Sequence, residues 1–321
     1  MIMITKTKRW RGRPWQTAML LAVMLFAWLV PQGAWADDLE TVQLEDKTFY
    51  VLRTSEDWNA FCLKVEGANM YSGMKSSFNA ILAADFSITR ACTYYRGIFD
   101  GNGHTINANI TDYSTGIFQN SKNATIKNLH LTGNINNKEN TDNSAGLVSR
   151  LEGETITISD CWVSATVKGG VVSGFVNRTY DVEPTITNCL FDGKLISVNN
   201  RHGAVFVGVV SWGTNVTVTN SLEKGTYENL SSVGLSCDYS TSFGNKQGSN
   251  NWAYTKGIGN DMDTLMNKSE LAMKLGGDNW KVLDNQVVPI RACPFEVNFD
   301  TYDMVPGTAN DELGMLKIPF S

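Results

Sequence analysis

Hydrophobic and polar residues alternate in a ten-residue phrase that occurs four times between Ala124 and Tyr227. The copies begin 32, 28 and 32 residues apart, at Ile126, Ile158, Ile186 and Val218. A second apolar element precedes each copy by 10 or 12 residues and contains one glycine: Gly116, Gly146, Gly174 or Gly208. Each repeat therefore holds at least two short strands and no helical pattern. A period of this length is typical of a solenoid, in which stacked repeats share one continuous core.

The third position of the phrase is Asn or Asp in all four copies: Asn128, Asp160, Asn188 and Asn220. These residue types tolerate a positive φ better than other non-glycine residues, so the recurrence predicts one bend at the same point of each coil. The next position, Leu129, Cys161, Cys189 or Ser221, is predicted to point inward, and alternate residues continue that inward column. Glu223 interrupts the column in the last copy, which predicts that the stack opens or ends there.

The segments outside the phrases predict the two ends of the fold. Thr41–Leu52 reads as one or two short strands around a turn at Glu45–Lys47. Ser55 then precedes a short amphipathic helix that ends at Gly67 and carries its apolar face on Trp58, Phe61 and Val65. We expect this helix to be a lid over the first coil, because an uncovered end would expose core and strand edges. Near the C-terminus, a helix is predicted at Ser269–Leu275 and a strand at Gln286–Ile290.

Several of these motifs resemble those of GLUG-motif proteins. The similarity is carried by Phe99-Asp-Gly-Asn-Gly-His-Thr-Ile106, by the glycine elements and Ile-x-Asn-Cys phrases, and by the Trp58/Phe61 helix, and it covers roughly residues 55–292. The glycine that often closes the motif is replaced by Ser149, Asn177 and Ser211. The resemblance implies a secreted right-handed parallel β-helix of the Bacteroidetes type with a pectin lyase-like fold. Both lines of reasoning predict an all-β solenoid with a short N-terminal capping helix.

The expected organisation has five parts. Residues 1–36 are a signal peptide, 37–54 short N-terminal strands, and 55–230 the capping helix and β-helix coils. Residues 231–292 are an irregular final coil with a closing helix and strand, and 293–321 are a C-terminal tail or linker.

The first 36 residues have the layout of a secretory signal. Five basic residues precede the apolar run Ala18–Val30, and Ala34-Trp35-Ala36 supplies a cleavage pattern. The run has 13 residues, fewer than the ~20 needed to span a bilayer. We expect export to the extracellular space, the cell surface or the periplasm, with no transmembrane helix after cleavage. The mature chain would carry 27 − 5 = 22 basic and 32 acidic residues, a net charge of −10, which excludes a basic footprint for nucleic acid.

The six cysteines lack any Cys-x-x-Cys pair and match no zinc pattern, so neither a metal nor a cofactor is expected. Cys161 and Cys189 occupy equivalent positions of successive repeats and are predicted to stack as buried thiols. A disulfide between adjacent coils is the alternative, because an oxidising compartment permits it.

Candidate catalytic groups form no recognisable set. The histidines His104, His130 and His202 accompany no triad pattern, and the two glycines just before His104 indicate a turn. Parallel β-helices often carry polysaccharide lyases and hydrolases, which makes Asp100, Asp160 and Asp192 the carboxylates to consider. Asp160 is explained by the Asn/Asp column, and the other two precede glycines as turn residues do. The sequence therefore favours a non-enzymatic protein.

The fifth position of the phrases predicts the one outward feature with binding character: His130, Trp162, Leu190 and Leu222. Alternation places these side chains on the outer face, where an aromatic and apolar stripe could bind a glycan or a host surface protein. Between these two roles, we expect that the C-terminal segment folds back and covers the stripe. The predicted function is adhesin-like binding outside the cell, and the alternatives are a polysaccharide lyase or hydrolase and a passive structural spacer.

Overall fold

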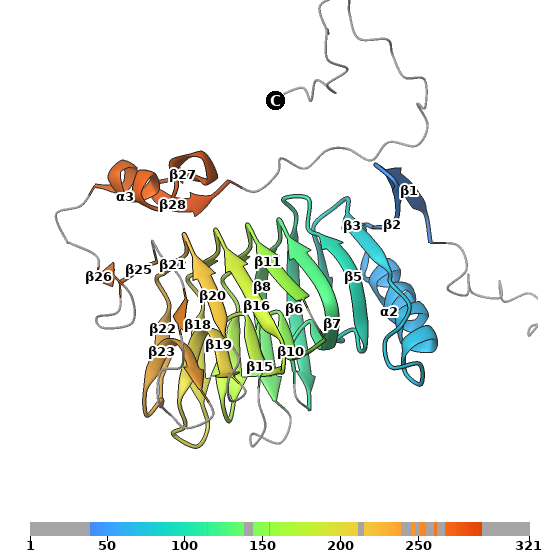
Figure 1. Cartoon of the computed structure of the whole chain (residues 1–321), viewed down its shortest axis with the longest axis horizontal. Coiled ribbons are helices and arrows are strands. Elements are labelled where there is room, and N and C mark those ends of the chain that lie inside the picture. The colour runs from blue at the N-terminus through green and yellow to red at the C-terminus, as the bar shows by residue number, and fades with distance from the viewer. Residues whose placement is uncertain are drawn as a thin grey trace, which may run out of the picture. The chain divides into compact units, whose positions relative to one another are not determined.

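The computed structural model describes residues 39–113, 115–137, 144–153, 155–210, 215–238, 246–247, 251–254, 260–261 and 267–290. The expected signal peptide and the C-terminal tail lie outside these residues. The described part is a mostly β, parallel solenoid of about six turns with a helix near its N-terminus, which confirms the predicted fold class. Figure 1 shows the coils stacked side by side, from β3 and β5 to β22 and β23.

Two large sheets form the walls of the solenoid. In the 15-stranded sheet the strands are β1 (Thr41–Leu44), β2 (Lys47–Leu52), β3 (Asn79–Leu82), β5 (Tyr95–Asp100), β7 (Phe118–Lys127), β9 (Ser144–Ala145), β10 (Val148–Glu152), β11 (Thr155–Ser159), β14 (Val172–Ser173), β15 (Val176–Tyr180), β16 (Glu183–Thr187), β19 (Gly203–Val210), β20 (Val216–Thr219), β23 (Val233–Asp238) and β24 (Lys246–Gln247). In the 11-stranded sheet they are β4 (Phe86–Ile88), β6 (Thr105–Asp112), β8 (His130–Asn137), β12 (Trp162–Val163), β13 (Thr166–Gly169), β17 (Leu190–Phe191), β18 (Lys194–Ser197), β21 (Leu222–Glu223), β22 (Thr226–Glu228), β25 (Trp252–Ala253) and β26 (Asn260–Asp261). Apart from the β1–β2 hairpin, the pairs within these sheets are parallel, as stacked coils require.

Equivalent positions of the four phrases are hydrogen-bonded neighbours. Ile158 pairs with Ile126 on one side and with Ile186 on the other, and Ile186 pairs with Val218. One sequence repeat is therefore one coil. The four residues are buried and line the interior, so the repeated pattern and the core have the same origin.

The recurrent Asn/Asp position is the predicted bend. The φ values of Asn128, Asp160, Asn188 and Asn220 are 54°, 54°, 53° and 49°. Side chains also join neighbouring coils here, because Asn188 Nδ2 donates to Asp160 Oδ1 at 3.0 Å and Asn128 Nδ2 donates to Asp100 Oδ1 at 3.0 Å. Each bend thus uses a residue that tolerates the left-handed region and that satisfies a polar group in the next coil.

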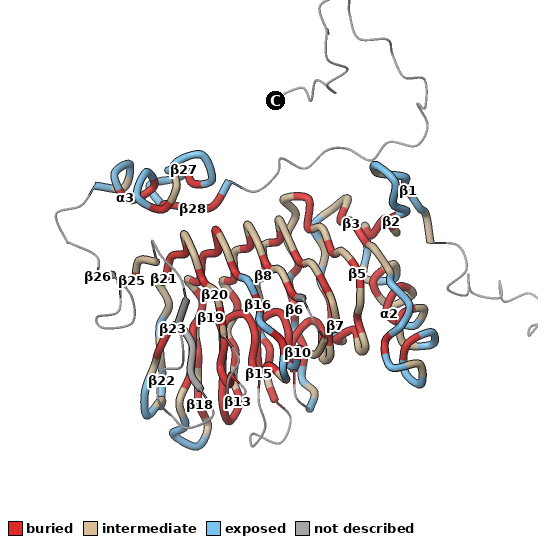
Figure 2. The backbone as a smooth tube through the Cα atoms, in the orientation of Figure 1, coloured by how far each residue is buried: buried red, intermediate tan, exposed pale blue. Residues whose placement is uncertain are grey.

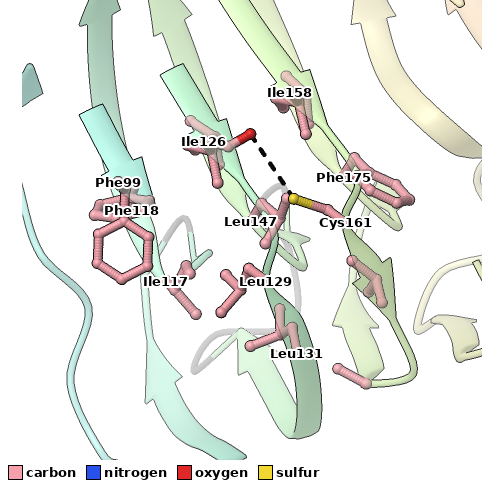
Figure 3. Packing of buried hydrophobic residues seen from close by; sticks show 14 of the residues in the cluster. Phe99, Ile117, Phe118, Ile126, Leu129, Leu131, Leu147, Ile158, Cys161 and Phe175 are labelled. Carbon is pink, nitrogen blue, oxygen red and sulfur yellow. Dashed lines mark hydrogen bonds between the residues drawn. The ribbon is translucent and has the colours of Figure 1, made fainter. Parts of the chain in front are cut away.

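The interior is a single hydrophobic cluster that runs through the stack. Residues of the inward column such as Leu131, Val163 and Phe191 are fully buried, and Figure 3 shows the packing around Ile126, Ile158 and Leu131. Buried and intermediate residues alternate along the strands, which gives the red and tan banding of Figure 2. Each fully buried Val, Leu, Ile or Phe side chain contributes roughly 1.5–3 kcal/mol. The core is therefore the main source of stability, and the outer faces are free of that constraint.

Helix α2 (Ser55–Asn69) covers the N-terminal end of this core. Trp58 and Phe61 are fully buried, and the Trp58 ring lies 6.0 Å from Phe99 and 5.8 Å from Phe118. The predicted lid is confirmed, with two corrections to its ends. The N-cap is Thr54, whose side chain accepts from Asp57 N in a capping box, and the helix continues two residues beyond Gly67.

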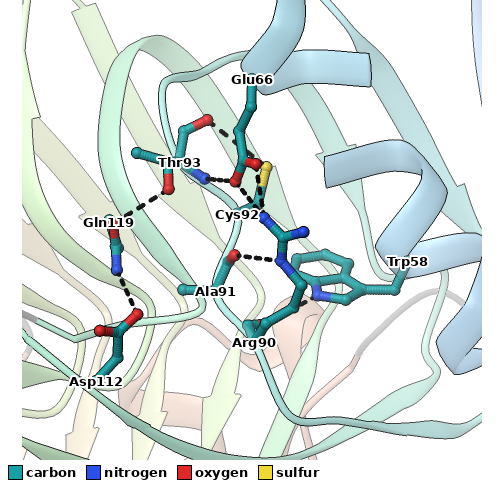
Figure 4. A network of polar contacts seen from close by, with 8 residues as sticks. All are labelled: Trp58, Glu66, Arg90, Ala91, Cys92, Thr93, Asp112 and Gln119. Carbon is teal, nitrogen blue, oxygen red and sulfur yellow. Dashed lines mark hydrogen bonds and ion pairs between the residues drawn. The ribbon is translucent and has the colours of Figure 1, made fainter. Parts of the chain in front are cut away.

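A polar network fastens the helix to the chain at residues 90–93 (Figure 4). The Trp58 indole N–H donates to Arg90 O at 2.9 Å. One turn beyond Cys62, the Glu66 carboxylate accepts from the Arg90 guanidinium at 2.6 Å and from Thr93 N at 3.1 Å. The lid is thus held by both apolar burial and directional bonds.

The stack does not end at Glu223, contrary to the expectation from the sequence. β21 pairs with β25, so that Glu223 lies beside Ala253, and β19 pairs with β23. The Glu223 side chain is fully buried, and its Oε1 accepts a hydrogen bond from Tyr227 Oη at 2.6 Å. A buried carboxylate is tolerated inside the column because a partner from the same coil satisfies it.

Four cysteines in the described part of the chain are buried free thiols: Cys62, Cys92, Cys161 and Cys189. Cys161 and Cys189 lie on adjacent coils, where the Cys161 thiol donates to Ser159 O at 3.1 Å and the Cys189 thiol to Thr187 O at 3.2 Å. Burial, and then the neighbouring Cys161 thiol, raise the pKa of Cys189 well above its usual value. This is the stacked-thiol arrangement that the sequence favoured.

Candidate functional site

The outer stripe predicted from the fifth position of the phrases lies in register on four parallel strands. Trp162 pairs with His130 on one side and with Leu190 on the other, and Leu190 pairs with Leu222. The stripe continues to Trp252, which pairs with Leu222. Sequence reasoning missed Trp252 because the phrase is not repeated around it.

The C-terminal half of the stripe is covered by the segment Asn267–Ile290, here called the closing module. It consists of α3 (Lys268–Lys274), a 3-10 turn (Gly277–Asn279) and the antiparallel hairpin of β27 (Trp280–Leu283) and β28 (Gln286–Pro289), in agreement with the predicted helix and strand. Leu190 and Leu222 are fully buried against Leu271, Leu275, Trp280 and other apolar residues of the module. The Trp280 indole N–H also donates to Asn220 O at 3.1 Å. These two leucines therefore serve packing.

The N-terminal half of the stripe, His130 and Trp162, is partly exposed and joined to a polar cluster. The two rings stack with centroids 4.2 Å apart and planes 15° apart. The Trp162 indole N–H donates to Asp192 Oδ1 at 2.7 Å, and the Ser164 hydroxyl donates to the same oxygen at 2.6 Å. Because the hydroxyl hydrogen is used in that bond, Ser164 Oγ accepts from His130 Nε2 at 2.9 Å.

The order of these groups differs from that of a hydrolytic triad. In a triad the histidine lies between the carboxylate and the hydroxyl, whereas here Ser164 lies between Asp192 and His130. The cluster instead fixes the orientation of the two rings. One face of Trp162 lies on His130, and its other neighbour along the stripe is Leu190.

Seven amide and hydroxyl side chains and one lysine adjoin this cluster on the same sheet. We call this set the open face: Asn107, Asn109, Thr111, Thr132, Asn134, Asn136, Thr166 and Lys168. Its residues form rows across the coils, since Asn134 pairs with Asn109 and with Thr166. Asn109 and Asn134 are exposed. The next two coils supply one partner each to the ion pair Lys194–Glu228, with Nζ and Oε2 2.5 Å apart, and this hydrogen bond lowers the pKa of Glu228.

The three candidate carboxylates each hold a local contact in the structure. Asp100 accepts from Asn102 N at 2.8 Å and pairs with Lys127 at 3.1 Å, and Asp160 accepts from Asn188. Asp192 alone lies in the polar cluster of the stripe. The structure thus places the turn at Asp100 and the bend at Asp160, while the sequence had no signal for the bonds that Asp192 accepts.

The other two histidines lie apart from the stripe. His104 Nδ1 is 3.0 Å from Asp85 Oδ1, and the same oxygen accepts from Thr105 N at 2.8 Å. His202 is partly buried and its Nε2 has no hydrogen-bond partner among the described residues. Burial, and then the charge of Arg201, lower the pKa of His202 below its usual value.

Within the described residues, no three His, Cys, Asp or Glu side chains are arranged to hold a metal ion. A helix that is long and apolar enough to cross a membrane is likewise not found there. No protein-family model matches the chain, and comparison with curated proteins and with solved structures gives no match. The fold and the surface define a parallel β-solenoid of about six turns, closed by a helix at one end and partly covered by the closing module near the other.

Proposed function

We propose that this chain is an exported, non-catalytic solenoid that binds an extended glycan along the open face. The observation that carries the proposal is the in-register array of amide and hydroxyl side chains beside the rigid His130–Trp162 pair. The signal-like N-terminus supports export, and an adhesin-like role at the cell surface or in the extracellular space is part of the proposal. The resemblance to GLUG-motif proteins of Bacteroidetes is part of the same proposal.

The chemistry of the open face favours a saccharide over a protein. Asn and Thr side chains both donate and accept hydrogen bonds, as sugar hydroxyl groups do. Protein interfaces usually centre on a fully buried apolar or aromatic core. The apolar members of this stripe, Leu190 and Leu222, are already covered by the closing module. Binding of a host protein is therefore the second outcome that the experiment distinguishes.

The test is a glycan and host-protein array probed with the chain from residue 37 onward, followed by calorimetry on any hit. The double variant Asn109→Ala/Asn134→Ala removes two exposed, paired amides from the open face. Each lost hydrogen bond is worth about 1 kcal/mol, so affinity should fall on the order of tenfold or more. The control Thr157→Ala/Thr185→Ala removes another in-register pair on the other sheet and should leave binding unchanged.

Equal affinity of the Asn109→Ala/Asn134→Ala variant and the unmodified chain would refute the open face as the site. Absence of any ligand on the array would favour the spacer alternative, and release of cleaved sugar would favour the enzyme alternative. Trp162→Ala separates the two roles of the stripe. A loss of affinity supports binding at its exposed end, and a lower melting temperature reports packing.

A further inference from the structure

A second polar surface lies on the outer side of the other sheet, where two arginines face outward on adjacent coils. Arg150 of β10 pairs in register with Arg178 of β15, and Asn120 of β7 precedes Arg150 in the same row. The neighbouring row contains Lys122, Glu152 and Tyr180. No motif in the sequence pointed to this juxtaposition, because the residues come from three different repeats.

Tyr180 holds both guanidinium groups in place. The Arg150 guanidinium carbon lies 4.1 Å from the centroid of the Tyr180 ring, and that of Arg178 lies 5.7 Å from it. Arg178 Nη1 also donates to Tyr180 Oη at 2.8 Å. Stacking of Arg150 on the ring leaves the edge of its guanidinium, which carries the N–H donors, directed away from the ring, whereas Arg178 is held through one of its own donors. The two cations are thus oriented before any ligand arrives.

The charges of this surface are not balanced by the protein. Among the residues named in these two rows, Glu152 carries the one carboxylate. It accepts a hydrogen bond from Arg150, with Nε and Oε1 2.7 Å apart. Within the described residues, neither Arg178 nor Lys122 forms an ion pair with a carboxylate, and the buried Nε of Arg178 has no hydrogen-bond partner. Like charges on directly neighbouring strands destabilise a sheet unless something compensates them. This cationic patch is unusual in a chain whose formal net charge is −5.

We propose that Lys122, Arg150 and Arg178 form a binding site for the carboxylate or sulfate groups of an acidic polysaccharide. Guanidinium groups bind such planar or tetrahedral oxyanions through paired, charge-assisted hydrogen bonds. The flat outer face of stacked coils fits a linear polymer, and three cations on an acidic chain fall short of a nucleic-acid footprint. This site is on a different sheet from the open face, so it does not depend on the proposed function.

The experiment measures binding of three oligosaccharides of equal length, one sulfated, one of uronic acids and one neutral, by calorimetry at low and physiological salt. The unmodified chain should bind at least one acidic probe, and its affinity for that probe should be lower at higher salt. Its affinity for the neutral probe should be lower than for the acidic probe. Arg150→Gln/Arg178→Gln should lower the affinity for the acidic probe by about tenfold or more. Whichever acidic probe binds identifies the preferred oxyanion.

Two further variants make the result decisive. Glu152→Gln removes the carboxylate that competes for Arg150, so it should bind the acidic probe several times more tightly. Lys75→Gln/Lys281→Gln removes the same two charges from exposed positions elsewhere and should leave the affinity unchanged. The proposal is overturned if neither acidic probe binds, if the lysine control loses as much affinity as the arginine variant, or if Glu152→Gln weakens binding. Asn109→Ala/Asn134→Ala should not affect the acidic probes, which separates this site from the open face.

Discussion

The bend at Asn188 offers a quantitative test of why Asn or Asp recurs once per coil. Asn188 has a φ of 53°, and its Nδ2 donates to Asp160 Oδ1 at 3.0 Å. Asn188→Gly removes the hydrogen bond but keeps a residue at ease in the left-handed region, at a cost of about 1–2 kcal/mol including the greater freedom of glycine in the unfolded chain. Asn188→Ala loses the same bond and adds ~1–2 kcal/mol for the left-handed backbone.

The expected order of stability is therefore Asn188, then Asn188→Gly, then Asn188→Ala, with Asn188→Val lowest because a β-branched residue fits a positive φ worst. Urea unfolding followed by circular dichroism measures the series, with midpoints compared only if the slopes agree. Thr185→Ala, an exposed strand residue of the same coil, should change the free energy of unfolding by less than about 0.5 kcal/mol. An alanine variant as stable as the glycine variant would refute the role assigned to the backbone, and the loss of a bond alone would then explain the column.

Two other predictions concern the closing module and His202. Trp280→Ala should detach the closing module, because truncation of a buried aromatic side chain costs about 3–5 kcal/mol. Amide hydrogen exchange should then become faster at β21 and stay unchanged at β11. An unchanged exchange rate at β21 would contradict the proposed cover. Burial and then Arg201 lower the pKa of His202, so the native state favours the neutral imidazole and stability is lost as the pH falls below the ordinary value of 6.5. The melting temperature should therefore drop more between about pH 7.5 and about pH 5.5 in the unmodified chain than in His202→Gln, and parallel curves would rule out this histidine as the cause.

The interior of the solenoid could be predicted from the sequence because each coil repeats the same physical requirements. Asn128, Asp160, Asn188 and Asn220 all adopt the predicted positive φ. The inward residues Leu131, Val163 and Phe191 are fully buried, and the helix with Trp58 and Phe61 closes the end as expected. The alternation of inward residues, the bend and the helical cap are local properties, and each one is recognisable from a few neighbouring residues.

Contacts between distant segments explain what the sequence did not reveal. The sequence predicts that the C-terminal segment covers the stripe, but it does not specify the residues that meet, such as the Trp280 indole and the backbone of Asn220, 60 positions earlier. The continuation of the stack past Glu223 depends on a bond from Tyr227 and on a strand at Trp252 that lies outside the repeated phrase. A polar residue in the inward column, Glu223, predicts an end of the stack only because the repeated pattern does not show its hydrogen-bond partner Tyr227.

The outer faces differ from the core in a way that bears directly on function. The seventh position of the phrase, which faces outward, is Thr132, Ser164, Asp192 or Lys224, so one column holds two hydroxyls, a carboxylate and an ammonium group. The inward neighbour one position earlier is Leu131, Val163 or Phe191 in the first three copies. Packing constrains the inward column, whereas water accepts any polar residue on the outward one. A binding site on this solenoid is therefore a property of two or three particular coils. Mutations that test binding must be chosen coil by coil, as for Asn109/Asn134 and Arg150/Arg178, because a change copied into every repeat would report only on the fold.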